Sequence, residues 1–122
     1  MTESTPETFL PLTPLTFGIL TAVASGPKSG YGIVRGIEEG SHGRLSPGTG
    51  TVYVALQRLM DQGLLAPADA PADAPDDNRQ RRWYALTPLG KRTVVLEARR
   101  LAGALRLAAE AGILVDEEVM DP

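Results

Sequence analysis

The sequence predicts a mainly α-helical fold with a small two-stranded β wing, and three observations support this prediction. Apolar residues recur at helical spacing in four stretches of the 122-residue chain. Three of these stretches begin with a hydroxyl residue followed by proline, at Thr13-Pro14, Ser46-Pro47 and Thr87-Pro88; the hydroxyl group caps a helix and proline suits its first position. Between the third and fourth stretches, alternating residues predict a β-hairpin. This order is the layout of a winged helix-turn-helix followed by a long C-terminal helix.

The N-terminal part of the chain predicts a flexible segment and two helices. Residues 1–12 are polar and contain proline, so we expect them to be flexible. The first helix places Leu15 and Ile19 on one apolar face and ends at residues 25–27. The second helix spans Ser29 to Glu39 and contains three glycines. Each glycine lowers helix propensity by up to about 1 kcal/mol, so we expect packing within the domain to stabilise this helix.

The third helix has the clearest boundaries and two different faces. It runs from about Pro47 to Gln62, and Gly63 is its stop signal. One face is apolar, and the opposite face is either simply solvated or in contact with a polar partner. Five residues of that opposite face can form hydrogen bonds: Thr49, Thr51, Tyr53, Gln57 and Arg58.

The hairpin that follows has an unusual tip. Residues 64–66 and 80–86 predict its two strands. The segment 67–78 repeats Pro, Ala and Asp, and its prolines exclude helix and central strand, so we expect a solvated acidic loop. Trp83, on the second strand, is expected to pack against the domain, and contact with a flat apolar ligand is the alternative.

A long helix is predicted over residues 88–113, followed by an acidic tail at 114–122. The helix carries an apolar seam of the kind that two helices share when they pack together. The seam either belongs to the core of the chain or meets a second subunit, and the second interpretation is favoured because three helices already precede it. The seam consists of Val94, Ala98, Leu101, Leu105 and Ala108.

Composition excludes several classes of protein. The chain has no cysteine and one histidine, so it offers neither disulfides nor a thiolate metal site, and very little for histidine-based catalysis. Its acidic residues are not paired as catalysis requires. We therefore expect no enzyme activity, cofactor or metal. No apolar stretch approaches the roughly 20 residues of a membrane span, and residues 1–9 lack the pattern of a signal peptide, so we expect a cytoplasmic protein that does not bind a membrane.

Charge is distributed unevenly, although its sum is only −3. The loop at 67–78 and the C-terminal tail are acidic, while residues 79–92 carry five basic side chains and no acid. Three of these basic residues are expected to lie beside the predicted third helix: Arg79, Arg81 and Arg82. They are either simply exposed to solvent or contact DNA phosphates. The acidic loop would weaken that attraction, and could even be autoinhibitory.

Four motifs together make the chain similar to the PadR family of bacterial transcriptional regulators. Residues 25–33, SGPKSGYGI, resemble the family's Gly-Pro-x-His-Gly-Tyr-x-Ile, and residues 50–59, GTVYVALQRL, resemble Gly-Thr-Leu-Tyr-x-x-Leu-x-Arg-Leu. Residues 63–65 resemble Gly-Leu-Ile, and residues 82–90, RWYALTPLG, resemble Arg-x-Tyr-x-Leu-Thr-x-x-Gly. The chain departs from this pattern at Ser29, where histidine is usual, and in its long acidic wing tip.

The resemblance implies that residues 13–87 form a DNA-binding domain and residues 88–113 a dimerisation helix. The short members of the family are homodimers through their N-terminal and C-terminal helices and are mostly repressors. We therefore expect Leu15 and Ile19 to join the seam in a dimer interface, and two third helices to bind a pseudo-palindromic operator. Some relatives bind flat hydrophobic ligands between subunits, so a small apolar effector is an additional expectation. The residues expected to contact double-stranded DNA are Lys28, Thr49, Thr51, Tyr53, Gln57, Arg58, Arg79, Arg81 and Arg82.

Some alternatives remain open at this stage. Tyr31 is expected in the core, and a phosphate contact through its hydroxyl group is the less favoured interpretation. Gly48 and Gly50 either have no special role or let DNA approach the backbone closely. Arg58 either binds DNA or pairs with Asp61 or Glu39. The main alternative function is a winged-helix protein-interaction module that does not bind DNA, which the net charge favours.

Overall fold

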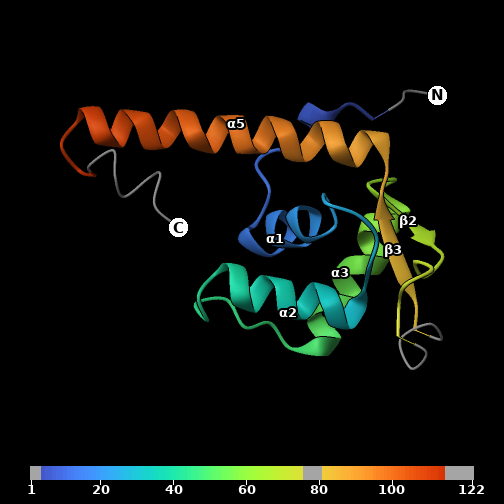
Figure 1. Cartoon of the computed structure of the whole chain (residues 1–122). Helices are drawn as coiled ribbons and strands as arrows, with labels where there is room; N and C mark the ends of the chain where they lie inside the picture. The colour runs from blue at the N-terminus through green and yellow to red at the C-terminus, as the bar shows by residue number, and fades with distance from the viewer. Residues whose placement is uncertain (1–3, 76–80, 115–122) are drawn as a thin grey trace.

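The computed structural model describes residues 4–75 and 81–114 (Figure 1). Within these residues the chain is mainly helical and carries a small antiparallel sheet, so the predicted fold class is confirmed. A short 3₁₀ helix, η1, precedes four α-helices. The elements are η1 (Pro6–Phe9), α1 (Pro14–Ala22), β1 (Lys28–Ser29), α2 (Gly30–Gly40), α3 (Thr49–Asp61), β2 (Leu65–Ala68), β3 (Trp83–Leu86) and α5 (Pro88–Glu110).

The hydrophobic core lies between α1, α2, α3 and the sheet. The apolar face predicted for the third helix is buried, with Val52, Leu56 and Leu59 inaccessible to solvent. Each such side chain contributes roughly 1.5–3 kcal/mol through removal from water, which fixes the rotation of α3 and exposes its opposite face. The other members of the core are Ile19, Leu20, Val23, Ile33, Ile37, Ala55, Leu64, Leu65, Tyr84 and Val94.

Side-chain caps begin three of the α-helices. The predicted caps at Thr13 and Thr87 are confirmed, since their hydroxyl groups accept hydrogen bonds from the backbone N–H groups of Thr16 and Gly90. Ser29 caps α2 in the same way. The predicted start at Ser46-Pro47 is wrong, because α3 begins at Thr49 with Gly48 as its N-cap.

The delayed start of α3 has a tertiary cause. Leu45 packs against the core, and its backbone N–H donates to the hydroxyl group of Ser41 at 2.9 Å. This anchor holds the chain outside the helix just before residue 46. The hydroxyl group of Ser46 instead contacts Glu38 Oε1 at 3.4 Å. At its other end, α3 stops before Gly63, which adopts a φ of 78° as the stop signal predicted.

The sheet has three strands in the order β1-β3-β2, one more than predicted. Lys28 and Ser29 pair with Tyr84 and Trp83, but two residues are too few to leave an alternating pattern in the sequence. Strand β2 continues to Ala68, so the predicted loop begins later than residue 67. Proline is tolerated at position 67 because β2 is an edge strand. The acidic loop lies partly outside the described residues.

The N-terminal segment is more ordered than expected. From residue 6 onward it forms η1, which lies against α5, and then passes to α1 (Figure 1). Phe9 and Leu12 pack against the core. The backbone N–H of Leu12 donates to Glu97 Oε2 at 2.6 Å. The buried carboxylate of Glu97 thereby attaches the segment to α5, a contact across 85 residues that local sequence patterns cannot reveal.

Helix α5 is long, and only its N-terminal half packs against the rest of the domain. Its first half packs against α1 and η1, while its C-terminal half extends beyond the three-helix core (Figure 1). It ends at Glu110, three residues before the predicted end. Apart from Leu114, the predicted acidic tail lies outside the described residues. Among the described residues, no helix is long and apolar enough to cross a membrane.

Candidate nucleic-acid interface

The exposed face of α3 is the first component of the candidate interface. Thr49, Thr51, Tyr53, Gln57 and Arg58 all lie on its solvent-facing side, as the periodicity predicted. Unlike the other three α-helices, α3 has no side-chain cap at its start. The N–H groups of its first turn are therefore not occupied by a capping side chain, and such groups attract phosphate oxygens.

Tyr53 lies between α3 and the start of α2. Its side chain is 41% exposed, and its ring edge and hydroxyl group rest against the backbone of Gly30. A Cβ atom at Gly30 would lie 2.6 Å from the Tyr53 hydroxyl oxygen, which is closer than real contacts allow. Glycine at this position therefore lets the tyrosine lie across the junction of the two helices.

Two polar residues farther along α3 have partners inside the chain. Gln57 Nε2 donates to Asp61 Oδ1 at 3.1 Å on the exposed surface. Arg58 Nη2 donates to the hydroxyl group of Thr16 on α1 at 2.8 Å, rather than to Asp61 or Glu39. Because this bond directs the guanidinium group towards α1, the geometry does not support the predicted contact of Arg58 with DNA.

A cationic cluster lies beside α3, centred on Tyr31. The core position expected for Tyr31 is wrong, since its side chain is 50% exposed. The guanidinium carbon of Arg81 lies 5.1 Å from the centre of the Tyr31 ring, within the range of a cation–π contact. Arg35 Nη1 donates to the Tyr31 hydroxyl oxygen at 3.1 Å, and Arg35 also pairs with Glu39. We call Tyr31, Arg35 and Arg81 together the Tyr31 cluster.

The Tyr31 cluster joins the wing to the helix-turn-helix. Pairing of β1 with β3 places the start of α2 beside the residues that precede β3. The hydrogen bond to Tyr31, and then that to Glu39, raise the pKa of Arg35, so this side chain remains charged. Arg35 was missed at the sequence level, although its spacing of four residues from Tyr31 on one helix indicates the contact.

The remaining predicted basic contacts have different surroundings. Lys28 lies in β1, and its ammonium group donates to the Ser25 hydroxyl oxygen at 3.4 Å. Arg82 is exposed directly before β3, and Arg79 lies outside the described residues. Trp83 is half-buried on β3, opposite Ser29 and Ala68, which agrees with packing against the domain.

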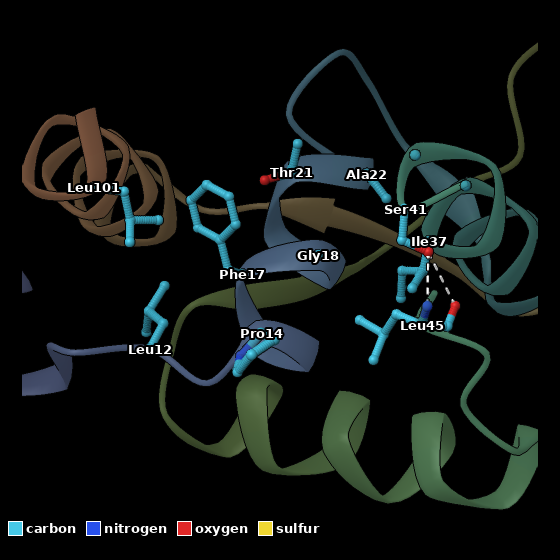
Figure 2. A pocket seen from close by; sticks show the side chains of 12 residues that line it. Leu12, Pro14, Phe17, Gly18, Thr21, Ala22, Ile37, Ser41, Leu45 and Leu101 are labelled. Carbon is cyan, nitrogen blue, oxygen red and sulfur yellow. Dashed lines mark hydrogen bonds between the residues drawn. The ribbon is translucent and has the colours of Figure 1, made fainter. Parts of the chain in front are cut away.

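An apolar groove of about 410 Å³ lies on the face formed by α1, α2 and α5 (Figure 2). Figure 2 shows Phe17 of α1 reaching towards Leu101 of α5, while Ile37 and Leu45 border the opposite side. Gly18 lies between them, where a Cβ atom would be 3.3 Å from Ile37. This groove is separate from the polar face of α3.

The predicted dimer residues fall into two groups. Ile19 and Val94 are buried in the core of the chain and have almost no exposed surface. The prediction that they lie in a dimer interface is therefore wrong. Their apolar periodicity reflects packing inside the subunit, because the first half of α5 lies on α1. Leu15 is half-buried and also packs against the core. Farther along α5 the seam leaves the core: Leu101 lines the groove, and Ala98, Leu105 and Ala108 retain exposed surface.

Comparison with known sequences places most of the chain in one family. A sequence model described as the transcriptional regulator PadR-like family matches residues 19–95. The chain is also 38% identical over 84 residues to an uncharacterized 37.1 kDa protein in transposon TN4556 of Streptomyces fradiae. That match covers 69% of this chain and 22% of the relative, so the chain spans about a fifth of the relative's length.

Solved structures of regulators share the fold. A PadR family transcription regulator from hypervirulent Clostridium difficile superposes with a TM-score of 0.66 at 17% identity, over 80% of this chain and 97% of that chain. A transcriptional regulator from Clostridium thermocellum gives 0.62 at 20% identity, over 79% and 87%. Bacillus subtilis PadR in complex with operator DNA gives 0.54 at 24% identity, over 67% and 45%. At these identities the comparison concerns the fold alone.

Proposed function

The chain belongs to the PadR-like family of transcriptional regulators, and from that premise we propose that it binds operator DNA as a homodimer through α3 and the wing. Membership also means that it is a regulator rather than an enzyme, as the composition predicted. A regulator of this kind works where the DNA is, so we expect it in the cytoplasm.

The observation that carries this proposal is the combination of a polar α3 face with the adjacent Tyr31 cluster. The first turn of α3 and the hydroxyl groups of Thr49 and Thr51 would contact phosphates. Tyr53 and Gln57 would face the major groove, where helix residues read base edges. Arg81, held over the Tyr31 ring at 5.1 Å, would contact the backbone beside them. Bacillus subtilis PadR, a structural neighbour, was solved with operator DNA.

The unsupported half of α5 favours a homodimer. Leu105 is 40% exposed on the seam, beyond the point where Leu101 lines the apolar groove. If two copies are related by a two-fold axis, the projecting half of each α5 can cover the groove of the other copy. This arrangement would bury both apolar surfaces and present two copies of α3 to successive major grooves, about 34 Å apart.

The direction of regulation and the effector are finer parts of the proposal. The resemblance to the short members of the family implies repression, so we expect repression. A small apolar effector would fit the chemistry of the groove lined by Phe17, Ile37 and Leu101, where it would compete with the α5 helix of the other copy. Bound there, it would lie beside the helices that we expect to form the dimer, and could change the distance between the two α3 helices.

A salt titration of binding tests the proposal. Affinity of the full chain for DNA upstream of its own gene should fall linearly on a log–log plot against salt, because phosphate contacts release counterions. Because a homodimer carries two copies of Arg81, Arg81→Ala should reduce the slope by about two units. A protein-interaction module without DNA binding, favoured by the net charge of −3, would show no binding to either this DNA or random DNA.

A further inference from the structure

The outermost ridge of α3 carries an exposed apolar side chain at its centre. Val54 of α3 is 73% exposed. Gly50, Val54, Gln57 and Asp61 follow one another at spacings of four, three and four residues, so they share one side of the helix, and all four are exposed. This side lies opposite the buried residues that hold α3 in the core.

Neither folding nor packing accounts for valine at this position. Its side chain is not part of the hydrophobic core or of the layer packed against it. It does not line the apolar groove either. Valine is also a weaker helix former than the unbranched residues, because a helix restricts its χ1 angle. A single exposed valine is ordinary on a protein surface, but this one occupies the middle of the face that the proposed function directs at DNA.

The chemistry of the major groove supplies a partner for such a group. Among the four base-pair orientations, only those that contain thymine present an apolar group there, the C5-methyl group. The neighbours of Val54 leave room for a close approach, because a Cβ atom at Gly50 would meet nothing within 4 Å. Gln57, one turn farther along, is engaged with Asp61 at 3.1 Å. The apolar contact is therefore flanked by small and polar groups.

We propose that Val54 contacts the methyl group of one thymine in each half-site and so makes the regulator prefer thymine at that position. This inference rests on the proposed function, since it requires α3 to enter the major groove. It assigns a specificity-determining role to a side chain that has neither a charge nor a hydrogen-bonding group.

The test removes the methyl group from the DNA without changing base pairing. Binding sites are first selected with the full chain from random duplexes. Each thymine of one half-site is then replaced by uracil, one position at a time. With the unmodified chain, uracil at one position should weaken binding about fourfold, the value of one methyl group removed from water. Other uracil positions should have little effect.

Two variants identify the side chain responsible. Val54→Ala should weaken binding to the thymine duplex and abolish the difference between thymine and uracil at that position. Gln57→Ala, on the same ridge, should weaken binding but retain the difference. Both side chains are exposed, so circular dichroism should show an unchanged fold.

The outcomes separate the two proposals. Equal binding of thymine and uracil duplexes at every position, or a difference that persists in Val54→Ala, would overturn the role of Val54 while DNA binding stands. If no duplex is selected, the proposed function fails, and the role of Val54 fails with it.

Discussion

At the scale of single residues, the contact between Tyr53 and Gly30 connects packing to the proposed interface. The tyrosine ring occupies the space that a side chain at position 30 would fill. The motif residues Gly30 and Tyr53 are 23 positions apart in the chain and belong to different helices. With tyrosine at position 53, this contact leaves no room for a side chain at position 30.

Gly30→Ala tests whether the position of Tyr53 matters for DNA. The new methyl group would displace the ring, and DNA affinity should fall several-fold, as measured by fluorescence anisotropy. Stability should change little, because the displaced atoms are the far end of an exposed side chain. The control is Gly103→Ala in α5, where a Cβ atom meets nothing within 4 Å. Unchanged affinity in Gly30→Ala would contradict the role given to Tyr53.

The buried carboxylate of Glu97 is the second residue-scale feature. Hydrogen bonding from Arg100, and to a smaller extent from the Leu12 backbone, lowers the pKa of Glu97 below its ordinary value of 4.5, against the opposing effect of burial. The ionised group therefore stabilises the fold at pH values above its unfolded-state pKa. This contribution is lost as the pH falls through the lowered folded-state pKa.

Glu97→Gln should consequently lower the free energy of unfolding at neutral pH by roughly 1.5–3 kcal/mol, the range for hydrogen bonds to a charged group. The difference between the unmodified chain and the variant should shrink as the pH falls below about 4.5. Urea unfolding monitored through Trp83, the single tryptophan, measures both. A difference that is independent of pH would show that the charge of Glu97 does not contribute.

At the scale of elements, Thr87 joins the wing, the end of α3 and the start of α5. Its hydroxyl oxygen accepts from the Gly90 N–H at 3.0 Å and donates to the Gly63 carbonyl oxygen at 2.6 Å. Its backbone N–H donates to the Leu64 carbonyl oxygen at 3.2 Å. The close packing continues at Gly90, where a Cβ atom would collide with the carbonyl oxygen of Leu64.

Thr87→Ala should lower the free energy of unfolding by about 1–2 kcal/mol, because it removes the cap of α5 and the bond to Gly63. Thr87→Ser keeps the hydroxyl group and should retain most of the stability. Both are compared by urea unfolding at one protein concentration, since the proposed dimerisation would make stability depend on concentration. Equal stability of the alanine and serine variants would exclude the hydroxyl group as the stabilising feature.

The elements that sequence periodicity predicted are those whose patterns are local. The four α-helices, the caps at Thr13 and Thr87 and the hairpin follow from spacing and from turn residues. Strand β1 could not be predicted, because two residues form it only through pairing with β3. The ordered N-terminal segment depends on Glu97, and the start of α3 on packing of Leu45. These features are decided by contacts between distant parts of the chain.

The candidate interface was predictable to a similar extent. The periodicity of α3 correctly identified its exposed polar face. Tyr31 was assigned to the core because aromatic residues with helical spacing usually pack inside, and no local pattern shows that Arg81 lies over its ring. Arg58 binds Thr16, which is 42 residues away in the sequence. The apolar seam did not show where α5 leaves the core, between Val94 and Leu101.

At the scale of the whole molecule, the helical extension and the groove predict association of two copies. Leu101→Glu places a charge beside the groove and should produce monomers in sedimentation experiments, with weaker operator binding. Leu107 is 67% exposed but lies off the seam, so Leu107→Glu is a matched control and should remain dimeric. Intact dimers of Leu101→Glu would refute the assignment of this surface to the dimer.

The distribution of charge also matters at this scale, because the sum of −3 does not favour binding to DNA. The basic groups of the Tyr31 cluster lie beside α3. The acidic groups near them have partners: Glu39 pairs with Arg35, and Asp61 accepts a hydrogen bond from Gln57. Surface pairs of this kind contribute little to stability and can open when a phosphate approaches. We therefore expect modest affinity per subunit and a strong dependence on dimerisation.

Footprinting of the full chain on DNA upstream of its own gene tests the central claim most directly. We expect two protected segments whose centres lie one helical turn apart, about 34 Å. The double variant Thr51→Ala, Gln57→Ala changes only exposed side chains of α3 and should abolish this protection while the fold is retained. No protected segment, or protection that is unchanged in the double variant, would contradict DNA recognition by α3.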